Sequence, residues 1–244
     1  METTIFTPAP AAQFAAAGFA ILPKLYAPAE VAALLHCVES APASGPSFRR
    51  SAEVFAIRNL LGEIPALWPL LDTPALRGLL GGLFPAGCQL VKGIYFDKPA
   101  QSNWLVAWHQ DLMINVEQRA DQPGYGPWTS RAGWTSVQPP VAVLEDVVTI
   151  RLHLDDCAAD NGALKVVPAS HRRGAVAAPD IAALTPAATV CAVPAGGAML
   201  MKPLLLHASN RSTSARPRRV IHLEFAAVEL PAGLAWRERR AVLF

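Results

Sequence analysis

Short runs of β-branched and aromatic residues, separated by proline and glycine, dominate the chain from residue 89 onward. Runs of this kind between turn residues are typical of β-strands, and no strand–helix–strand alternation competes with them. They favour an all-β core, most naturally a jelly roll with helices packed outside it. We expect the strands at residues 89–95, 104–109, 147–154, 163–167, 197–201 and 220–228.

The part before residue 89 has a different character. Apolar residues follow Pro28 at helical spacing, and residues 63–83 suggest one or two helices broken around Thr73 and Pro74. Only residues 18–23 look β-like. We therefore expect one domain over residues 1–244. Its mainly helical part, residues 1–88, packs on a jelly-roll core at residues 89–244, and the Ala/Pro-rich residues 175–188 form a surface loop.

Composition limits the possible partners. The chain has 244 residues, 52% of them hydrophobic, and a net charge of +2, so it can bury a large core but has no global field to recruit nucleic acid or a membrane. No basic residue precedes Lys24, and Pro8 and Pro10 interrupt the apolar start, which argues against a signal peptide. We expect a cytoplasmic protein. Its four cysteines form no C-x-x-C pair, so we interpret them as reduced thiols.

A candidate metal site begins in the segment Trp108-His109-Gln110-Asp111. On an extended backbone, His109 and Asp111 project to the same side while Gln110 points away. A third protein ligand must come from elsewhere, and His207 is the best candidate. Two histidines and one carboxylate are typical of non-haem Fe(II) oxygenases, in which three coordination positions stay open.

Two rival pairs have similar spacing. His153 and Asp155 lead into a polar turn, where Asp155 is better explained as a turn or capping residue. His222 and Glu224 lie on the last predicted strand, which leaves too little chain downstream for another strand with a third histidine. Of the three pairs, the one at His109 is therefore preferred.

Several motifs then follow in a specific order. They are His109-Gln110-Asp111, Asp155-Asp156, the run from Asn161-Gly162 through Pro168-Ala169-Ser170-His171, His207-Ala208-Ser209-Asn210, and Pro217-Arg218. This order resembles the phytanoyl-CoA dioxygenase family of Fe(II)/2-oxoglutarate oxygenases, from about Gly18 to the last strand. The resemblance implies a double-stranded β-helix (cupin-like) fold, iron on His109, Asp111 and His207, 2-oxoglutarate bound by Arg218, and dioxygen as the second cosubstrate.

Chemistry independently favours an arginine for the cosubstrate. The far carboxylate of 2-oxoglutarate needs a fixed cation, and the planar fork of arginine pairs with it bidentately. Strand alternation groups Arg218 with Val220, His222 and Glu224 on a polar inner face, and Arg219 with a dry packing face. We expect Arg216 and Arg219 to be exposed to solvent.

Two further cosubstrate contacts follow only from the resemblance. Lys98 matches a family lysine that reaches 2-oxoglutarate, although an exposed loop lysine is an equally good interpretation. Ser209 matches a position that hydrogen-bonds the cosubstrate, with a plain turn serine as the alternative. We interpret His171 as a residue that organises its turn. Where the family has P-G-S-H, this chain has Ala169 in place of glycine, which should disturb only the turn.

Other departures concern the primary substrate. Arg151 stands where some relatives have an aromatic residue, so a second guanidinium is available for a substrate carboxylate. Residues 115–146 form an insertion longer than the family usually has. Its aromatic and glycine/proline content predicts an ordered lid. We expect substrate contacts from Tyr125, Trp128, Arg131 or Trp134; the alternative is that its tryptophans pack on the barrel rim or in an oligomer interface.

The sequence therefore predicts a 2-oxoglutarate-dependent non-haem iron dioxygenase, a hydroxylase acting on an unactivated C–H bond of a small, carboxylated metabolite. Asp111 disfavours halogenation, because related halogenases replace that carboxylate with a small residue. Desaturation and cyclisation would use the same residues. The alternative from another class is a non-catalytic jelly-roll protein that binds a ligand or a structural metal. A zinc hydrolase is weaker, because no separate general base stands out.

Overall fold

The structure, a computed structural model, describes residues 8–42, 44–45, 47–50, 54–97, 105–131 and 133–242. Lys98, for which we predicted a cosubstrate contact, lies outside these residues. The helices are α1 (Pro8–Ala17), α2 (Pro28–Glu39), α3 (Leu60–Glu63), α4 (Trp68–Leu71), α5 (Pro74–Leu83), α6 (Val141–Asp146) and α7 (Ala178–Leu184).

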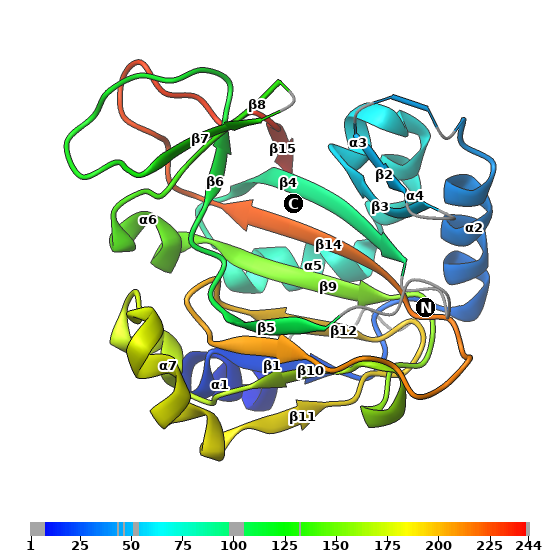
Figure 1. Cartoon of the computed structure of the whole chain (residues 1–244). Coiled ribbons are helices and arrows are strands. Elements are labelled where there is room, and N and C mark those ends of the chain that lie inside the picture. Colours follow the sequence, from blue (N-terminus) through cyan, green and yellow to red (C-terminus); the bar gives the residue numbers. More distant parts are fainter. Residues whose placement is uncertain are drawn as a thin grey trace.

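Two facing antiparallel sheets form the centre of the fold (Figure 1). In the large sheet the strand order is β1-β12-β9-β14-β4-β3-β2, and β15 also pairs with β4. Its strands are β1 (Phe19–Leu22), β2 (Phe48–Arg50), β3 (Val54–Arg58), β4 (Cys88–Asp97), β9 (Val148–His153), β12 (Ala198–Met201), β14 (Arg219–Ala226) and β15 (Arg240–Val242). The small sheet has the order β11-β10-β13-β5. It consists of β5 (Val106–His109), β10 (Leu164–Val166), β11 (Thr189–Cys191) and β13 (His207–Ser209). The predicted jelly-roll fold is confirmed.

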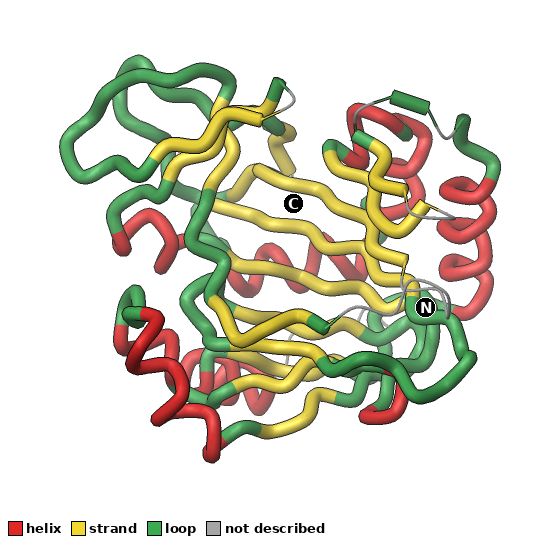
Figure 2. The backbone as a smooth tube through the Cα atoms, in the orientation of Figure 1, coloured by secondary structure: helices red, strands yellow, loops and turns green. Residues whose placement is uncertain are grey.

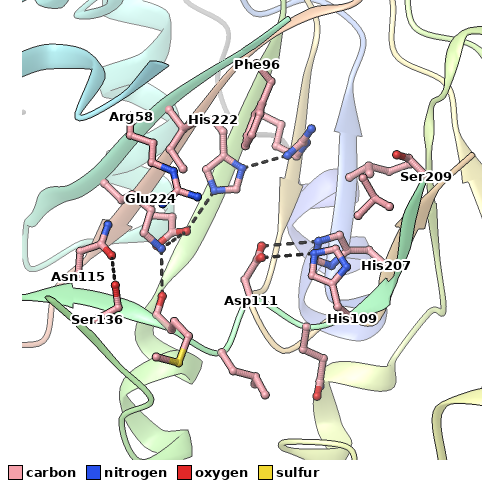
Figure 3. A pocket seen from close by; sticks show the side chains of 18 of the residues that line it. Arg58, Phe96, His109, Asp111, Asn115, Ser136, His207, Ser209, His222 and Glu224 are labelled. Carbon is pink, nitrogen blue, oxygen red and sulfur yellow. Dashed lines mark hydrogen bonds and ion pairs between the residues drawn. The ribbon is translucent and has the colours of Figure 1, made fainter. Parts of the chain in front are cut away.

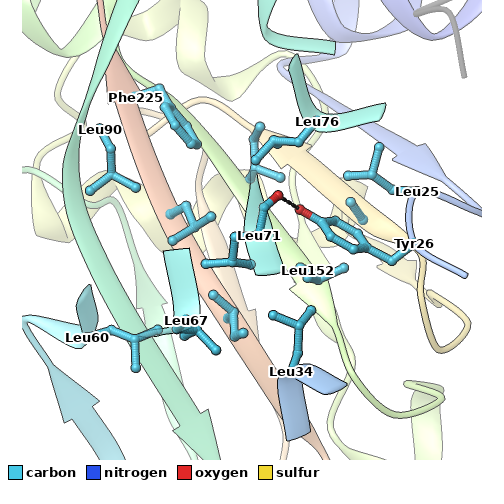
Figure 4. Close-up of a cluster of buried hydrophobic side chains, with 14 of the residues drawn as sticks. Leu25, Tyr26, Leu34, Leu60, Leu67, Leu71, Leu76, Leu90, Leu152 and Phe225 are labelled. Carbon is cyan, nitrogen blue, oxygen red and sulfur yellow. Dashed lines mark hydrogen bonds between the residues drawn. The ribbon is translucent and has the colours of Figure 1, made fainter. Parts of the chain in front are cut away.

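Helices cover the outer face of the large sheet (Figure 2). Helix α5 begins where the sequence predicted a break, because Thr73 Oγ1 accepts a hydrogen bond from the Leu76 N–H and Pro74 fits the first turn. Leucines of these helices pack against Leu152 and Phe225 of the sheet. Within this core the Tyr26 hydroxyl donates to the Leu71 carbonyl at 2.5 Å (Figure 4). Burial of this apolar face holds the helices on the sheet.

Side-chain alternation then decides what faces the interior between the sheets. On β14, Ile221, Leu223 and Phe225 join the helix-packed core, whereas His222 and Glu224 line a cavity on the opposite face. This separation into a dry face and a polar face agrees with the alternation predicted from the sequence. The large sheet thus has an apolar outer surface and a polar inner surface.

The insertion at residues 115–146 contains a small antiparallel sheet. Its strands, in the order β6-β8-β7, are β6 (Ile114–Val116), β7 (Trp128–Arg131) and β8 (Trp134–Val137). It packs with α6 and Trp236 in a separate apolar cluster. Strands of three or four residues carry too few positions to show a period-2 pattern, which is why the sequence did not predict them.

Two other parts of the chain differ from prediction. Strand β1 falls within the β-like residues 18–23, as predicted, whereas β2 and β3, which the sequence did not indicate, extend the large sheet at its other edge. Residues 175–188, expected as a loop, contain α7 and a further 3₁₀ turn at Thr185–Ala187. Alanine favours helix, and Pro179 is tolerated because it lies in the first turn. Among the described residues, none of the helices is long and apolar enough to cross a membrane.

Candidate metal centre and active site

His109 and His207 face each other across two paired strands. The register of β5 and β13 places them directly opposite one another, with ring centroids 4.2 Å apart. Asp111 follows β5, and its two carboxylate oxygens lie 3.7 Å from His109 Nε2 and 3.7 Å from His207 Nε2 (Figure 3). The potential ligand atoms of all three residues lie within 4.8 Å of one another. The structure thus brings the three predicted ligands to one point.

Backbone carbonyls fix the orientation of both imidazole rings. His109 Nδ1 lies 2.8 Å from the Ala107 carbonyl oxygen, and His207 Nδ1 lies 2.9 Å from that of Leu205. Because a carbonyl only accepts, each Nδ1 carries a proton, and each Nε2 faces Asp111. Two imidazoles oriented in this way and one carboxylate are a donor set that fits a divalent transition metal.

Gln110 points away from this centre, as the alternation predicted. Its Nε2 donates to the carbonyls of Gly174 at 2.8 Å and Leu204 at 2.5 Å, and its Oε1 accepts from the Val176 N–H at 2.7 Å. The glutamine therefore ties the strand that carries His109 and Asp111 to two other segments. The arrangement holds the two predicted ligands in place without entering the space between them.

The turn at Pro168–His171 supports His207 from the other side. Ser170 Oγ accepts a hydrogen bond from the Leu206 N–H at 2.8 Å, and the Val167 N–H donates to the Leu206 carbonyl at 3.0 Å. Ala169 adopts a left-handed backbone with φ +62°. Such a backbone favours glycine, so the departure from P-G-S-H introduces local strain in a turn that positions a ligand.

Charges around the centre favour an ionised aspartate. Burial opposes the charge of Asp111, but His207, His222, Lys92 and His109 together hold the pKa of its carboxyl at about 2. Burial lowers the pKa of His207 to about 4. At neutral pH the centre therefore offers a carboxylate and a neutral imidazole, the forms that bind metal.

A cavity of about 440 Å³ opens beside the three ligands. Arg218 and Ser209 line it, and both are buried. Arg218 donates to the Gly162 carbonyl, yet its Nε and the Ser209 Oγ have no hydrogen-bond partner among the described residues. Buried polar groups are almost always paired, so these two atoms fit a bound ligand rich in oxygen. The predicted cosubstrate residues Arg218 and Ser209 thus share the cavity with the metal ligands.

A second guanidinium, that of Arg151, lines the same cavity. Arg151 stacks 5.8 Å from the Phe96 ring centroid and donates to His222 Nδ1 at 3.0 Å. Burial, followed by the neighbouring charge of Arg218, lowers the pKa of Arg151 to about 10, so it stays cationic. In the part of the chain that the structure describes, no carboxylate lies within ion-pair distance of either arginine. Two buried cations thus share one cavity.

From Arg151 a chain of polar contacts crosses the large sheet. Since a guanidinium only donates, His222 Nδ1 is unprotonated and its Nε2–H donates to Glu224 at 3.1 Å. Glu224 pairs with Lys92 at 2.8 Å, and Lys92 also donates to the Met113 carbonyl at 3.1 Å. The sequence placed His222 and Glu224 on the inner face but did not assign them to the site, and it gave no signal for Lys92.

Glu224 and His222 also form, with Asp111, a second group whose potential ligand atoms lie within 4.8 Å of one another. Both side chains already have partners on the large sheet, unlike the free Nε2 atoms of His109 and His207. The first group therefore remains the better metal centre.

The insertion contributes residues other than those we predicted. Asn115 and Ser136 line the cavity, with the Ser136 hydroxyl donating to Asn115 Oδ1 at 2.8 Å. By contrast, Tyr125 and Trp128 pack in the apolar cluster around Trp236, and Arg131 is exposed at the end of β7. Trp134 is buried under the guanidinium of Arg237, 4.2 Å from its ring centroid.

None of these four side chains lines the cavity. On such short strands, the alternation of the sequence could not show which side chains face the cavity and which face away from it. Their contact with substrate stays a prediction, and it would require the small sheet of the insertion to move.

Outside the cavity, Arg219 is not exposed to solvent as we predicted. Only 20% of its side chain is accessible, because it pairs with Asp155 at 2.7 Å and with Glu39 at 2.7 Å. Both partners lie on the outer side of the large sheet, where β14 directs its odd-numbered side chains. Arg216 is exposed, as predicted, and pairs with Asp160 at 2.6 Å. All four cysteines are free thiols.

Comparison with known proteins identifies the family. The model of the phytanoyl-CoA dioxygenase (PhyH) family matches residues 14–220. The chain belongs to this family. The PhyH motifs quoted from the sequence therefore mark a true relationship, and the predicted family is confirmed. A search of curated proteins finds no significant match.

Solved structures share the PhyH fold of this chain at low sequence identity. EctD from S. alaskensis with bound Fe matches at TM-score 0.73 and 19% identity over 100% of this chain and 88% of its own. EctD with 2-oxoglutarate and 5-hydroxyectoine matches at TM-score 0.70 and 19% identity over 93% and 79%.

SnoK, described as a non-heme alpha ketoglutarate dependent carbocyclase from nogalamycin biosynthesis, matches at TM-score 0.65 and 16% identity over 94% and 87%. Iron and 2-oxoglutarate, predicted here from the sequence, are thus named for proteins of the same fold.

Proposed function

We propose that this PhyH-family protein is an Fe(II)/2-oxoglutarate-dependent dioxygenase that hydroxylates an unactivated C–H bond of a small, carboxylated metabolite. One observation carries the proposal. Two imidazole Nε2 atoms and the Asp111 carboxylate converge at a cavity in which buried polar atoms of Arg218 and Ser209 have no partner among the described residues. A set of donor atoms that suits iron therefore lies beside a buried guanidinium that can pair with a dicarboxylate.

His109, Asp111 and His207 would hold the iron. Their orientation is set in advance by the carbonyls of Ala107 and Leu205 and by the Asp111 N–H, which donates to the Pro203 carbonyl at 2.9 Å. When bound, iron with 2-oxoglutarate and dioxygen supplies the oxidant that removes a hydrogen atom from the substrate and returns a hydroxyl group. The protein's own part is to position the reactants and limit access of water.

Arg218 would bind the far carboxylate of 2-oxoglutarate, with Ser209 donating a further hydrogen bond. Arg218 is buried and already anchored to the Gly162 carbonyl, so its guanidinium is fixed before the ligand arrives. A preorganised fork loses little conformational entropy when it pairs with a carboxylate. Lys98 remains a predicted third contact.

Arg151 would take the carboxylate of the primary substrate. Its guanidinium is held by Phe96 and His222 and has no acidic partner among the described residues. The cavity of about 440 Å³ must hold the cosubstrate as well, which favours a small molecule over a large thioester. Hydroxylation is further supported by EctD, whose structure is described with 5-hydroxyectoine beside 2-oxoglutarate.

The test is succinate formation from 2-oxoglutarate by protein loaded with Fe(II) anaerobically and then exposed to air, across a panel of small carboxylates. We expect stimulated turnover in the wild type, its loss in His109→Ala and in Arg218→Ala, and its retention in Arg216→Ala. Arg216 is a matched control because it lies two residues from Arg218 but is exposed and paired with Asp160. A wild type that binds iron yet makes no more succinate than the His109→Ala and Arg218→Ala variants would instead indicate a non-catalytic binding protein.

A further inference from the structure

Glu238 is the cavity residue with the least explained position. It follows the last long strand, β14, and it lines the cavity although only 7% of it is exposed. Its Oε2 accepts a hydrogen bond from the Gly93 N–H at 2.9 Å, while its Oε1 is buried with no partner among the described residues. Oε2 of this carboxylate therefore has a structural role, whereas Oε1 makes no hydrogen bond with the described residues.

The structural role of Oε2 follows from the sheet topology. Strand β3 pairs with β4 at Ile94–Phe96, and β15 pairs with β4 at Cys88–Leu90. Between these two partners the edge of β4 is uncovered at Gly93, and the Glu238 side chain fills the gap. A neutral amide would satisfy the Gly93 N–H equally well, because only one oxygen acceptor is needed. The gap in the sheet therefore does not explain why this residue is a glutamate rather than a glutamine.

The surroundings of Glu238 do not neutralise its charge. No cation lies within ion-pair distance of it among the described residues. The nearby Lys92 directs its ammonium to Glu224 instead. Burial, which outweighs the Gly93 hydrogen bond, raises the pKa of Glu238 to about 7. A buried carboxyl of this kind is stabilised by a ligand group that donates a hydrogen bond to it.

Strand order places Glu238 and Arg151 at opposite sides of the cavity. Arg151 lies on β9, β14 and β4 follow in the sheet, and Glu238 lies at the far edge of β4. Two strand spacings of about 4.8 Å put the backbones of β9 and β4 roughly 10 Å apart. The Glu238 carboxylate lies against the β4 backbone, with Oε2 2.9 Å from the Gly93 N, and the Arg151 side chain reaches inward from β9. A small molecule can therefore reach both groups at once.

We propose that Glu238 binds a hydrogen-bond donor of the primary substrate, an ammonium or a hydroxyl group, through its unpartnered Oε1. The substrate is then a small carboxylate that carries this donor at the end remote from its carboxylate. The inference rests on the proposed function to the extent that Arg151 takes the carboxylate. It adds a specificity residue beyond the residues matched by the family model, which end at residue 220.

The test uses three sets of matched probes with three to six carbons: ω-amino carboxylates, ω-hydroxy carboxylates and unsubstituted carboxylates. Their Kd values are measured by calorimetry under anaerobic conditions, with Fe(II) and 2-oxoglutarate present and again with both omitted. We expect the wild type to bind one donor-bearing probe about tenfold or more tightly than the unsubstituted acid of equal length, as a hydrogen bond to a charged group allows. Which of the two donor series binds better identifies the group.

Glu238→Gln is the decisive variant. Its amide oxygen still accepts from Gly93, while an NH₂ group replaces the unpartnered oxygen, so an acceptor becomes a donor without loss of the structural contact. We expect the tenfold preference to vanish in Glu238→Gln for an ammonium probe, which cannot accept, and to fall severalfold for a hydroxyl probe, whose oxygen can accept from the new amide. The preference should persist undiminished in Glu229→Gln, an exposed carboxylate on the same segment. A wild type without preference, or a Glu238→Gln protein that keeps it, would overturn the inference.

Succinate formation with the same probes separates this inference from the proposed function. Donor-selective binding that depends on Glu238, without any succinate, would leave the inference standing and reject the oxygenase. Succinate formation stimulated equally by all three series would support the oxygenase and overturn the inference about Glu238. Thermal unfolding of each variant confirms that the proteins compared are folded.

Discussion

Removing Lys92 should destabilise the protein strongly, because it would leave a charge stranded in the interior. Only 10% of the Lys92 side chain and 5% of the Glu224 side chain are exposed, and the Lys92 Nζ lies 2.8 Å from the carboxylate. Burial disfavours both charges, yet each group offsets this effect on the other, so the pKa of Lys92 is raised and that of Glu224 is lowered. The pair is therefore ionised in the folded protein.

Lys92→Met keeps the length of the side chain and removes the charge. Among the described residues, Glu224 then keeps the His222 Nε2–H as its remaining side-chain donor, and the Met113 carbonyl loses the Lys92 donor. Breaking a buried pair in this way typically costs about 3–5 kcal/mol. Replacing Glu224 by glutamine in the same protein removes the stranded charge and keeps an acceptor for His222, so the double variant should recover about 2 kcal/mol of that loss.

Urea unfolding of the metal-free wild type, both single variants and the double variant measures this coupling. With an m-value near 3 kcal/mol/M, the loss expected for Lys92→Met moves the midpoint down by roughly 1–2 M. The four proteins form a double-mutant cycle that isolates the interaction of the two side chains. A Lys92→Met protein less than about 1 kcal/mol below wild type, or a double variant no more stable than Lys92→Met, would refute the reasoning.

Three further predictions concern stability. Ala169→Gly should raise the free energy of unfolding by about 0.5 kcal/mol, because φ is +62° there. Ala188→Gly, at φ −69°, should lower it, and equal effects of the two substitutions in urea unfolding would contradict the strain at Ala169. Gln110→Leu should cost about 2–4 kcal/mol, because it leaves two carbonyls and one N–H without their partner, and an unchanged melting temperature would show that these groups find other partners. The third concerns pH. The pKa of Glu238 is raised from 4.5 to about 7 by burial, so ionisation of this carboxyl destabilises the folded state as pH rises, with no cost below pH 4.5 and the full cost, at most roughly 3 kcal/mol, above pH 7. Metal-free Glu238→Gln should therefore lose less stability than the wild type between pH 5 and pH 8, and parallel curves for the two proteins would contradict the burial of that charge.

Much of the fold could be predicted because long strands carry a clear pattern. The ten-residue strand β4 and the inner and outer faces of β14 follow from runs of apolar residues and their alternation. The short strands of the insertion carry no such pattern, and the sequence predicted a loop at the alanine-rich α7 because Pro179 in it and Pro186 after it obscured its helix propensity. Local sequence determines an element only when the element is long enough for its period to show.

By itself, the sequence predicted the three residues proposed as metal ligands, their order along the chain and the arginine proposed to bind the cosubstrate. These residues occur in motifs whose spacing reflects local backbone geometry, such as the alternation that sets Gln110 apart from His109 and Asp111. Only the tertiary structure decided which other polar groups share the cavity. Lys92, Glu224 and Glu238 meet there through the register of β4 with β14 and the gap between β3 and β15. Their proximity depends on pairings between distant segments, which no local pattern records, and the burial and charge contacts that shift their pKa values exist only once those segments have packed.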